Sequence, residues 1–371
     1  MKHTIIGGGI GGLTLALLLE KKGFNVEIYE QAESFQPIGA GIILAINAMK
    51  VYTHLGIHEQ IEHHGIELSE MNITNPSFDI LSKTDFSNLK SKFQTKTIAI
   101  HRAQLQNILL KNLSTTQIHL GKKLKSINKL KDEYELTFQN GDVIKRKMLI
   151  GADGLRSKVR HYIFPNSNIR NGHQACWRGV TSFKLSTFQQ NKLLEAWGKK
   201  VRFGFVPIDN EKVYWYALKS TPSNEKPIFD FNNMFKNFNP LVTELIKSTP
   251  QNSIHYAQIE DLLPMKNWYY NSICLLGDAA HATTPNMGQG ACQAIEDAYV
   301  LSEKLSTENI KNAFSEYQQE RYSKASTIVK NSWRIGKISH LSNPILVTLR
   351  DTIMKLTPSS VGQKQLENIF N

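Results

Sequence analysis

The first residues suited to a chemical task are the glycines of a turn near the start of the chain. Gly7, Gly9 and Gly12 form the pattern G-x-G-x-x-G between a buried strand predicted at residues 3–6 and an apolar helix predicted to include residues 13–19. Glycine permits the tight turn and lets backbone N–H groups approach a diphosphate, while the helix N-terminus adds about half a positive charge. A plain connection without a ligand explains these glycines less well, because glycine in an empty turn costs conformational entropy. The pattern therefore predicts a dinucleotide site.

An acid follows where such a site needs one. Glu30 ends the next predicted strand, residues 26–30. A carboxylate at the end of this strand accepts hydrogen bonds from a ribose 2′-OH. Glu30 is therefore the predicted contact to the adenosine ribose.

A second glycine-rich turn lies far away in the sequence and begins with an acid. It opens with Gly277-Asp278 and continues through Pro285 to Gly288-x-Gly290. An ionised carboxylate in a tight turn needs hydrogen-bond donors, and ribityl hydroxyls would supply them; the other interpretation is that Asp278 caps the following helix. The helix after Gly290 would point its positive N-terminus toward negative charge on such a cofactor. Two such turns suit FAD better than NAD.

The elements that must position these turns can be predicted from periodicity. Apolar residues at three/four spacing predict a helix over 102–113, and a meander over 124–149 contains the hairpin signal Asn140-Gly141. From about 171 to 268 the pattern changes to strand-like segments rich in aromatic residues. This region predicts a mostly antiparallel sheet in a separate lobe, and the chain after it is mainly helical.

Composition limits the class of protein. The 371 residues are 41% apolar, which is enough for an ordinary core, and the net charge of +12 comes from scattered lysines, so we expect no nucleic-acid partner. Cys176, Cys274 and Cys292 have no paired spacing, which predicts neither a disulfide framework nor a metal site and favours a cytoplasmic location. No stretch reaches the roughly 18 apolar residues of a membrane span.

Three motifs follow one another in a fixed order along the chain. They are the first glycine turn, the segment Asp153-Gly154-x-x-Ser157-x-Val159-Arg160, and the turn Gly277-Asp278-Ala-Ala-His281. In this order they closely resemble the single-component flavoprotein aromatic hydroxylases, the family of p-hydroxybenzoate, salicylate and urate hydroxylases. The resemblance covers nearly the whole chain. Gln31 departs from the family pattern, in which a basic residue often follows the ribose acid, so that diphosphate contact is not carried over.

The resemblance implies the fold class and its division into domains. We expect an α/β fold in which a Rossmann-like FAD-binding domain is interleaved with a mostly antiparallel β-sheet substrate domain, followed by C-terminal helices. The expected ranges are 1–70, 98–170 and 271–330 for the FAD-binding domain, 71–97 and 171–270 for the substrate domain, and 331–371 for the C-terminal helical segment.

The resemblance also implies roles for single residues. Arg102 resembles the arginine that contacts FAD phosphate or ribityl oxygens, and Asp153 lies in a motif tied to both the FAD diphosphate and the nicotinamide cofactor. Residues 39–41 would pass beside the flavin ring, to which Gly288 and Gly290 would present backbone N–H groups. The predicted FAD-binding residues are Gly7, Gly9, Gly12, Glu30, Gly41, Arg102, Asp153, Asp278, Pro285, Gly288 and Gly290.

Basic and aromatic side chains remain for the substrate. Arg202, Gly204 and Val206 share one face of a predicted strand, and Arg202 matches a substrate-side arginine of the urate hydroxylases, so it is the predicted catalytic residue. The alternative is a surface arginine on a sheet. Arg178 is a weaker case of the same kind, and we expect a structural or phosphate-side role for His281. The aromatic candidates for a pocket are Trp177, Phe203, Phe205, Tyr214, Trp215 and Tyr216, although aromatic residues on strands are more often ordinary core.

The implied activity is a monooxygenase reaction. NADPH or NADH would act as a transient co-substrate for tightly but non-covalently bound FAD, and O2 would form a flavin C4a-hydroperoxide that hydroxylates a small aromatic or heterocyclic substrate. Because only one complete dinucleotide fingerprint occurs, NAD(P)H would bind on the surface of the FAD lobe. Epoxidation of a larger lipophilic substrate and a non-catalytic flavin-binding redox module are the alternatives, and we expect a monomer or homodimer.

Overall fold

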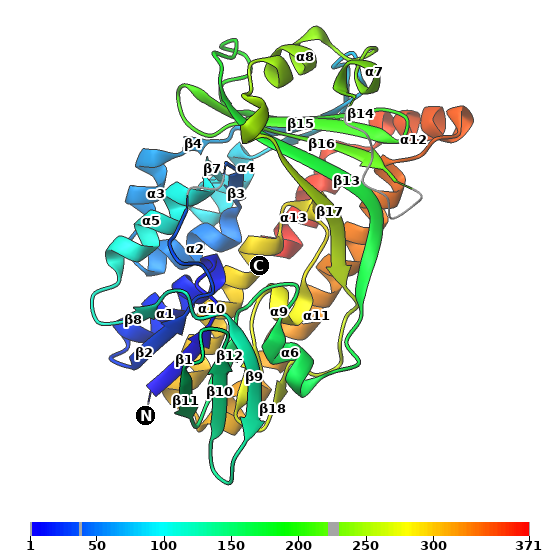
Figure 1. The fold of residues 1–371 in the computed structure, drawn as a ribbon. Helices are drawn as coiled ribbons and strands as arrows, with labels where there is room; N and C mark the ends of the chain where they lie inside the picture. Colours follow the sequence, from blue (N-terminus) through cyan, green and yellow to red (C-terminus); the bar gives the residue numbers. More distant parts are fainter. Residues whose placement is uncertain (1, 37–38, 222–229, 371) are drawn as a thin grey trace. The chain divides into compact units, whose positions relative to one another are not determined.

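The computed structural model describes residues 2–36, 39–221 and 230–370, which form two compact units that alternate along the chain (Figure 1). The predicted α/β class, with a largely parallel sheet, a mostly antiparallel sheet and C-terminal helices, is confirmed. Unit 1 comprises residues 1–36, 105–170 and 260–332, and unit 2 comprises residues 37–104, 171–259 and 333–371.

Unit 1 is built on a six-stranded sheet with the order β18-β19-β12-β1-β2-β8. Its strands run parallel except for the edge strand β18, which is antiparallel to β19. The inner strands are buried at nearly every residue, as expected for parallel strands that are covered on both faces. The strands are β1 (Lys2–Ile6), β2 (Asn25–Tyr29), β8 (Gln117–His119), β12 (Leu149–Gly151), β18 (Tyr269–Tyr270) and β19 (Ile273–Leu275).

Helices and a meander complete unit 1. The predicted meander is an antiparallel sheet of β9 (Leu124–Lys129), β10 (Tyr134–Phe138) and β11 (Val143–Arg146). Helices α1 and α10 pack closely because small residues meet: a Cβ added to Gly11 would lie only 3.0 Å from the Cβ of Ala294. The helices are α1 (Ile10–Lys21), α5 (Arg102–Asn112), α6 (Lys158–Ile163), α9 (Asp278–His281), α10 (Gly290–Thr307) and α11 (Ile310–Ser339), with a 3-10 turn η2 (Pro285–Met287).

Unit 2 contains a seven-stranded sheet with the order β17-β13-β16-β15-β14-β5-β6. Neighbouring strands pair antiparallel from β13 to β14, whereas β14 pairs parallel with β5. Its strands are β5 (Glu70–Thr74), β6 (Ile80–Asp85), β13 (Ile169–Ser182), β14 (Lys192–Trp197), β15 (Val201–Pro207), β16 (Lys212–Ser220) and β17 (His255–Leu262). A second sheet has β3 (Gly41–Leu44), β7 (Ile98–His101) and β4 (Ile66–Glu67).

The large sheet of unit 2 has two different faces. One face packs on α7 (Phe231–Met234) and α8 (Pro240–Lys247) through a core of aromatic and aliphatic side chains. Strand alternation turns the next side chain of each strand to the opposite face, which we call the polar face because Arg202 and Glu195 lie on it. The remaining elements are α2 (Ile46–His54), α3 (His58–His64), α4 (Ser87–Phe93) and η1 (Gln251–Ser253).

The C-terminal segment is helical and breaks where proline predicts it. Helix α12 (Pro344–Leu356) begins at Pro344, and α13 (Ser359–Phe370) begins directly after Pro358. Phe370 is buried, and Nζ of Lys50 donates a hydrogen bond to its carbonyl at 2.8 Å, so α13 packs on unit 2. Within the described ranges, no helix is both long and apolar enough to cross a bilayer.

The compact units do not coincide with the expected domain ranges. Residues 39–70 and 98–104 belong to unit 2 by their contacts, although we expected them in the FAD-binding domain. Strands β3 and β7 pair with each other and not with the parallel sheet, which explains the difference. The assignment of each range to cofactor or substrate binding stays a prediction.

Candidate functional site

The first turn of unit 1 requires glycine at its two ends. Gly7 has φ +111° and donates its N–H to the carbonyl of Tyr29 at 2.9 Å, and a Cβ at this position would lie 2.4 Å from the carbonyl oxygen of Ala152. A Cβ on Gly12 would lie 2.1 Å from the carbonyl oxygen of Gly7. Backbone therefore packs against backbone at both positions, and a side chain at either would force the turn apart.

Gly9 differs from Gly7 and Gly12, because a side chain added at this position would extend into open space. It has φ −73°, which any residue can adopt, and a Cβ there would meet no heavy atom within 4 Å. Gly9 is the N-cap of α1, whose first turn has neither a side-chain cap nor an acid. Backbone N–H groups at the start of this helix thus face a space free of side chains, which fits a diphosphate.

The predicted ribose acid lies beside this turn. Oε2 of Glu30 accepts a hydrogen bond from the N–H of Gly8 at 2.6 Å, and Oε1 accepts one from Ala32 at 2.8 Å. Two backbone donors therefore fix the carboxylate next to the glycines, while the residue stays partly exposed. This arrangement fits the adenosine half of FAD.

The geometry at Gly9 makes a direct prediction. Gly9→Ala should leave the free energy of unfolding of the FAD-free protein within about 0.5 kcal/mol of wild type, because the new methyl group meets no protein atom. The same methyl group would occupy diphosphate space, so FAD affinity should fall at least about tenfold. Isothermal titration with FAD and urea unfolding measure the two effects.

Gly12→Ala is the matched control for that experiment. Its methyl group would collide with the carbonyl of Gly7, so this variant should lose folding stability as well as FAD binding. Equal loss of stability in both variants, or normal FAD affinity in Gly9→Ala, would contradict the assignment of Gly9 to the cofactor.

The second turn presents one exposed acid between buried neighbours. Gly277 adopts φ +60°, and Asp278 is exposed although Leu276 and Ala279 on either side are buried. A Cβ on Gly290 would lie 4.0 Å from Oδ1 of Asp278, so the structure brings the acid next to the start of α10. An exposed carboxylate in this position can accept hydrogen bonds from ribityl hydroxyls.

The segment from Pro285 to Gly290 forms a second helix entrance, in which one glycine faces open space. Gly288 has φ +63°, and neither Gly288 nor Pro285 is buried. A Cβ on Gly288 would meet nothing within 4 Å, and α10 begins at Gly290 with no side-chain cap and no acid in its first turn. This entrance fits the electron-rich edge of a flavin for the same reason that α1 fits a diphosphate.

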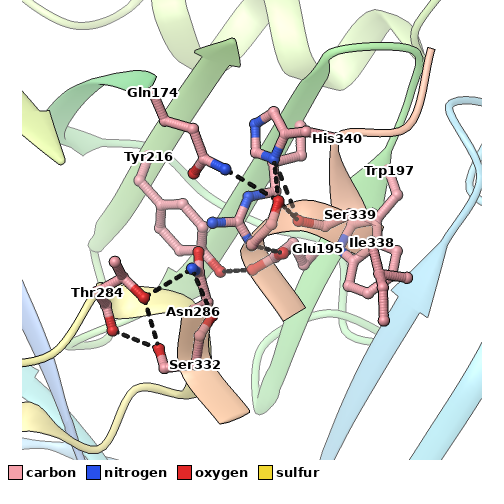
Figure 2. A network of polar contacts seen from close by, with 12 residues as sticks. Gln174, Glu195, Trp197, Tyr216, Thr284, Asn286, Ser332, Ile338, Ser339 and His340 are labelled. Carbon is pink, nitrogen blue, oxygen red and sulfur yellow. Dashed lines mark hydrogen bonds and ion pairs between the residues drawn. The ribbon is translucent and has the colours of Figure 1, made fainter. Parts of the chain in front are cut away.

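Hydrogen bonds to α11 hold this segment (Figure 2). Nδ2 of Asn286 donates to Oγ1 of Thr284 and to the carbonyl of Ser332, both at 2.9 Å, and Oγ of Ser332 donates to the carbonyl of Thr284 at 2.6 Å. The turn that begins at Pro285 is therefore anchored by buried side chains.

A buried acid that sequence analysis missed supports the second turn from behind. Asp297 of α10 is fully buried; Oδ2 accepts the N–H of Gly277 at 3.0 Å and contacts Nε2 of His281 at 2.5 Å, and Oδ1 accepts Nε of Arg321 at 2.7 Å. Burial alone would raise the pKa of Asp297, but the contacts with His281 and Arg321 outweigh it and hold that pKa well below its usual range. His281 therefore has the expected structural role.

The middle motif ties the two turns together. Asp153 caps α6: its carboxylate accepts hydrogen bonds from Ser157 Oγ at 2.5 Å and from the N–H of Lys158 at 2.7 Å. Arg160 is buried and donates through Nη1 to the carbonyl of Ala279 at 3.2 Å, inside the second turn. Asp153 thus has a structural partner in the motif, and its contact to cofactor stays a prediction.

Unit 2 brings together two further predicted contacts. Gly41 pairs with His101 across β3 and β7, and the N–H of Arg102 donates to the carbonyl of Ala40 at 2.9 Å. A Cβ on Gly41 would lie 2.6 Å from the ring of Tyr214, so the aromatic ring rests directly on the glycine backbone. Gly41 and the exposed Arg102 are therefore neighbours, and their roles toward FAD stay predictions.

Arg202 is not a surface residue. It is 1% exposed and lies on the polar face, where Nη1 contacts Oε1 of Glu195 at 2.9 Å. The same carboxylate accepts hydrogen bonds from Trp197 Nε1 at 2.7 Å and from the hydroxyl of Tyr216. Sequence analysis did not identify Glu195, because pairing with Arg202 depends on the β14–β15 register.

The aromatic candidates divide between the two faces. Tyr214 and Tyr216 lie on the face of Arg202, as the pairing of Tyr216 with Gly204 requires. Burial, with Glu195 beside it, raises the pKa of Tyr216 well above its ordinary value, so this residue remains a hydroxyl donor. The others lie in the core beneath α7 and α8: Trp177, Phe203, Phe205 and Trp215.

A second group on unit 2 was also missed. The side chains of Gln174 and His340 both reach the carbonyl of Gly336, Gln174 through Nε2 at 2.9 Å and His340 through Nδ1 at 3.1 Å (Figure 2). Burial and the nearby charge of Arg202 lower the pKa of His340 to about 3. His340 is therefore a neutral ring that donates from Nδ1.

This histidine predicts acid-sensitive stability. The unfolded chain binds a proton below its pKa of about 6.5 while folded His340 does not, so stability is complete above that pH and declines as pH falls toward 3. The loss at pH 5 relative to pH 7.5 should be about 2 kcal/mol. Urea unfolding at both pH values measures it, with His340→Gln removing this part of the difference.

The exposed His63 provides the control for that prediction. His63→Gln should keep the wild-type difference between the two pH values. If His340→Gln keeps it as well, the buried neutral histidine is not its source.

Known proteins match this chain over nearly its whole length. The family described as "FAD binding domain" matches residues 1–332. Aurachin C monooxygenase/isomerase of Stigmatella aurantiaca is 34% identical over 360 residues, covering 96% of this chain and 94% of that protein. The 2-heptyl-3-hydroxy-4(1H)-quinolone synthase of Pseudomonas aeruginosa is 29% identical, covering 100% and 98%.

Solved structures share the fold. The structure of Klebsiella pneumoniae HpxO complexed with FAD and uric acid superposes with a TM-score of 0.90 at 24% identity, covering 100% of this chain and 96% of that one. At this identity the likeness concerns the fold alone.

Proposed function

Because this chain belongs to the FAD binding domain family and is an FAD-dependent monooxygenase of aromatic or heterocyclic compounds, we propose that it uses NAD(P)H and O2 to hydroxylate a nitrogen heteroaromatic. The observation that carries this proposal is the pair of helix entrances in unit 1, at the starts of α1 and α10, where Gly9 and Gly288 leave open space and no side chain caps the helix. The predicted FAD-binding residues of both units belong to the proposal.

The relatives support the substrate class. One is named for a 4(1H)-quinolone product and another as a monooxygenase of aurachin C. Both cover nearly the whole of this chain, so the substrate-facing sheet lies within the matched region. A nitrogen heteroaromatic is therefore the first class to test, ahead of a simple phenol.

The chain's own residues would bind FAD and orient it. Bound FAD supplies the redox chemistry, taking two electrons from NAD(P)H and passing them to O2. In unit 1, the N–H groups at the start of α1 would hold the diphosphate, Glu30 the ribose and Asp278 the ribityl chain. The start of α10 at Gly290 would stabilise negative charge on the flavin ring.

The polar face of unit 2 would meet the substrate. Tyr214 and Tyr216 offer aromatic surface and hydroxyl groups there, and Arg202 is held among them by Glu195. Arg202 keeps its proposed part in catalysis, acting through its ion pair with Glu195. The folded sheet behind these groups would hold them in place.

Turnover with a substrate panel tests the proposal. FAD-loaded protein should oxidise NADPH or NADH slowly alone and at least about tenfold faster with the right heteroaromatic, with an oxygenated product detected by mass spectrometry. The panel contains a 2-alkyl-4(1H)-quinolone, urate, 6-hydroxynicotinate and p-hydroxybenzoate. A stable flavin that none of these ligands, nor an alkene panel, stimulates would favour the redox module instead.

A further inference from the structure

The ion pair between Glu195 and Arg202 is the central charge feature of the polar face. Nη1 of Arg202 lies 2.9 Å from Oε1 of Glu195, and the exposed fractions of the two side chains are 2% and 15%. The residues pair through strand register: Arg202 is opposite Trp197, and Glu195 is opposite Gly204, two positions away on the same face. The sheet therefore builds this pair into its backbone geometry.

Glu195 is held as an acceptor by three donors. Trp197 Nε1 donates to Oε1 at 2.7 Å, and the Tyr216 hydroxyl donates to Oε2. The ring of Tyr216 crosses Gly204 to do so, because a Cβ on Gly204 would lie 2.1 Å from its Cζ. A carboxylate with this many partners stays in place, since releasing it would leave buried donors unsatisfied.

Three other titratable groups on or beside this face are uncharged. His340 is neutral, and burial raises the pKa of Cys176 to about 11, so its thiol is uncharged. Tyr214 is likewise kept as a phenol by burial. Arg178 is half-buried, and its side chain is hydrogen-bonded to Tyr214.

We propose that Glu195 is a specificity-determining residue: by neutralising Arg202 it makes the polar face select an uncharged heteroaromatic, of the 4(1H)-quinolone type, over anionic substrates such as urate or a hydroxynicotinate. This inference rests on the proposed function, because it assumes that substrate binds on the polar face. An anion on this face would compete with Glu195 for Arg202 and would meet the carboxylate's own charge. A neutral ligand carries no such penalty.

Charge-matched binding measurements test this role. Each ligand is titrated into oxidised, FAD-loaded protein, and binding is followed by calorimetry and by the change in flavin absorbance. Wild type should bind a short-chain 2-alkyl-4(1H)-quinolone at least about tenfold more tightly than urate or 6-hydroxynicotinate. Glu195→Gln should shift that ratio at least about tenfold toward the anions, because Arg202 is then no longer neutralised.

Two further variants separate local from general effects. Glu195→Gln/Arg202→Gln removes both charges and should restore the preference for the neutral ligand. Glu211→Gln changes net charge by the same amount at an exposed turn and should leave the ratio unchanged. If Glu195→Gln does not fold, a wild-type preference for the anions still overturns the proposal.

The outcomes distinguish this inference from the proposed function. Wild type that binds and oxygenates an anion in preference to the quinolone overturns the role of Glu195 and leaves the monooxygenase proposal intact. An unchanged ratio in Glu195→Gln also overturns it. Wild type that binds and oxygenates none of the ligands overturns both.

Discussion

Asp297→Ala is expected to lower the free energy of unfolding by about 3–5 kcal/mol and to strip FAD from the purified protein. The alanine removes one of the two acids that pair with the buried guanidinium of Arg321 and leaves only Glu296, and the N–H of Gly277 loses its acceptor. Since Gly277 directly precedes Asp278, the turn proposed to hold the ribityl chain loses its support at the same time. Urea unfolding and the flavin absorbance of the purified variant measure both effects.

The network around Asp297 should also make the folding stability depend on pH. Because the pKa of Asp297 is lowered on folding, its contribution to stability is complete above the unfolded value of about 3.9 and is lost as pH falls below it. Asp297→Asn, which keeps an acceptor for Gly277, should retain part of the stability but lose this acid-dependent part.

Glu303 on the same helix provides a control. Its side chain is partly exposed and pairs with Lys22 at 2.9 Å, so Glu303→Ala should cost no more than about 1 kcal/mol. A comparable loss in both variants would mean that α10 is generally sensitive to substitution. Normal stability and FAD content in Asp297→Ala would show that the buried network does not support the turn.

Asp278→Ala and Glu30→Ala are each expected to weaken FAD binding by about ten- to a hundredfold. Hydrogen bonds to a charged carboxylate contribute about 1.5–3 kcal/mol, and each acid lies at one of the two glycine turns. Asp278 is exposed, so its replacement should leave the stability of the FAD-free protein unchanged. Titration of FAD-free protein with FAD, followed by flavin fluorescence, gives the dissociation constants.

Glu33→Ala is the matched control, because Glu33 is an exposed acid three residues beyond Glu30. This variant should bind FAD as wild type does. Wild-type FAD affinity in both Asp278→Ala and Glu30→Ala would refute the placement of the cofactor along these turns.

Local patterns were sufficient to predict the turns of unit 1. G-x-G-x-x-G forces a short strand–turn–helix, and the structure explains each glycine by backbone contact or open space. The acid at Glu30 lies beside that turn as expected, because strand β2 runs parallel to β1. Such features depend on neighbours in the sequence and so can be recognised without the fold.

Asp297 could have been found from a signal that we did not use. It lies three residues after Ala294 and four before Leu301, which puts an acid on the apolar stripe of a predicted helix. An acid on the buried face of a helix requires a buried partner. The partner itself, Arg321, lies on another helix and could not be identified from spacing.

The contact between Glu195 and Arg202 depends on how the strands pair. The same pairing decides which aromatic residues lie on which face of the sheet. Which strand lies beside β15, and in which register, decides that Glu195 reaches Arg202 and that Phe203 faces the core. Alternation correctly put Arg202 and Gly204 on one face, but it could not say which face packs against helices. The same limit explains why the expected FAD-binding range 1–70 does not follow the compact units, since residues 39–70 have most of their contacts in unit 2.

Labelling with ¹⁸O2 tests the monooxygenase account most directly. FAD-loaded protein supplied with NAD(P)H, ¹⁸O2 and a 2-alkyl-4(1H)-quinolone should yield a hydroxylated product that carries one labelled oxygen atom and accumulates with NAD(P)H oxidation. NAD(P)H consumption that yields only hydrogen peroxide, or a product whose new oxygen comes from water, would contradict it.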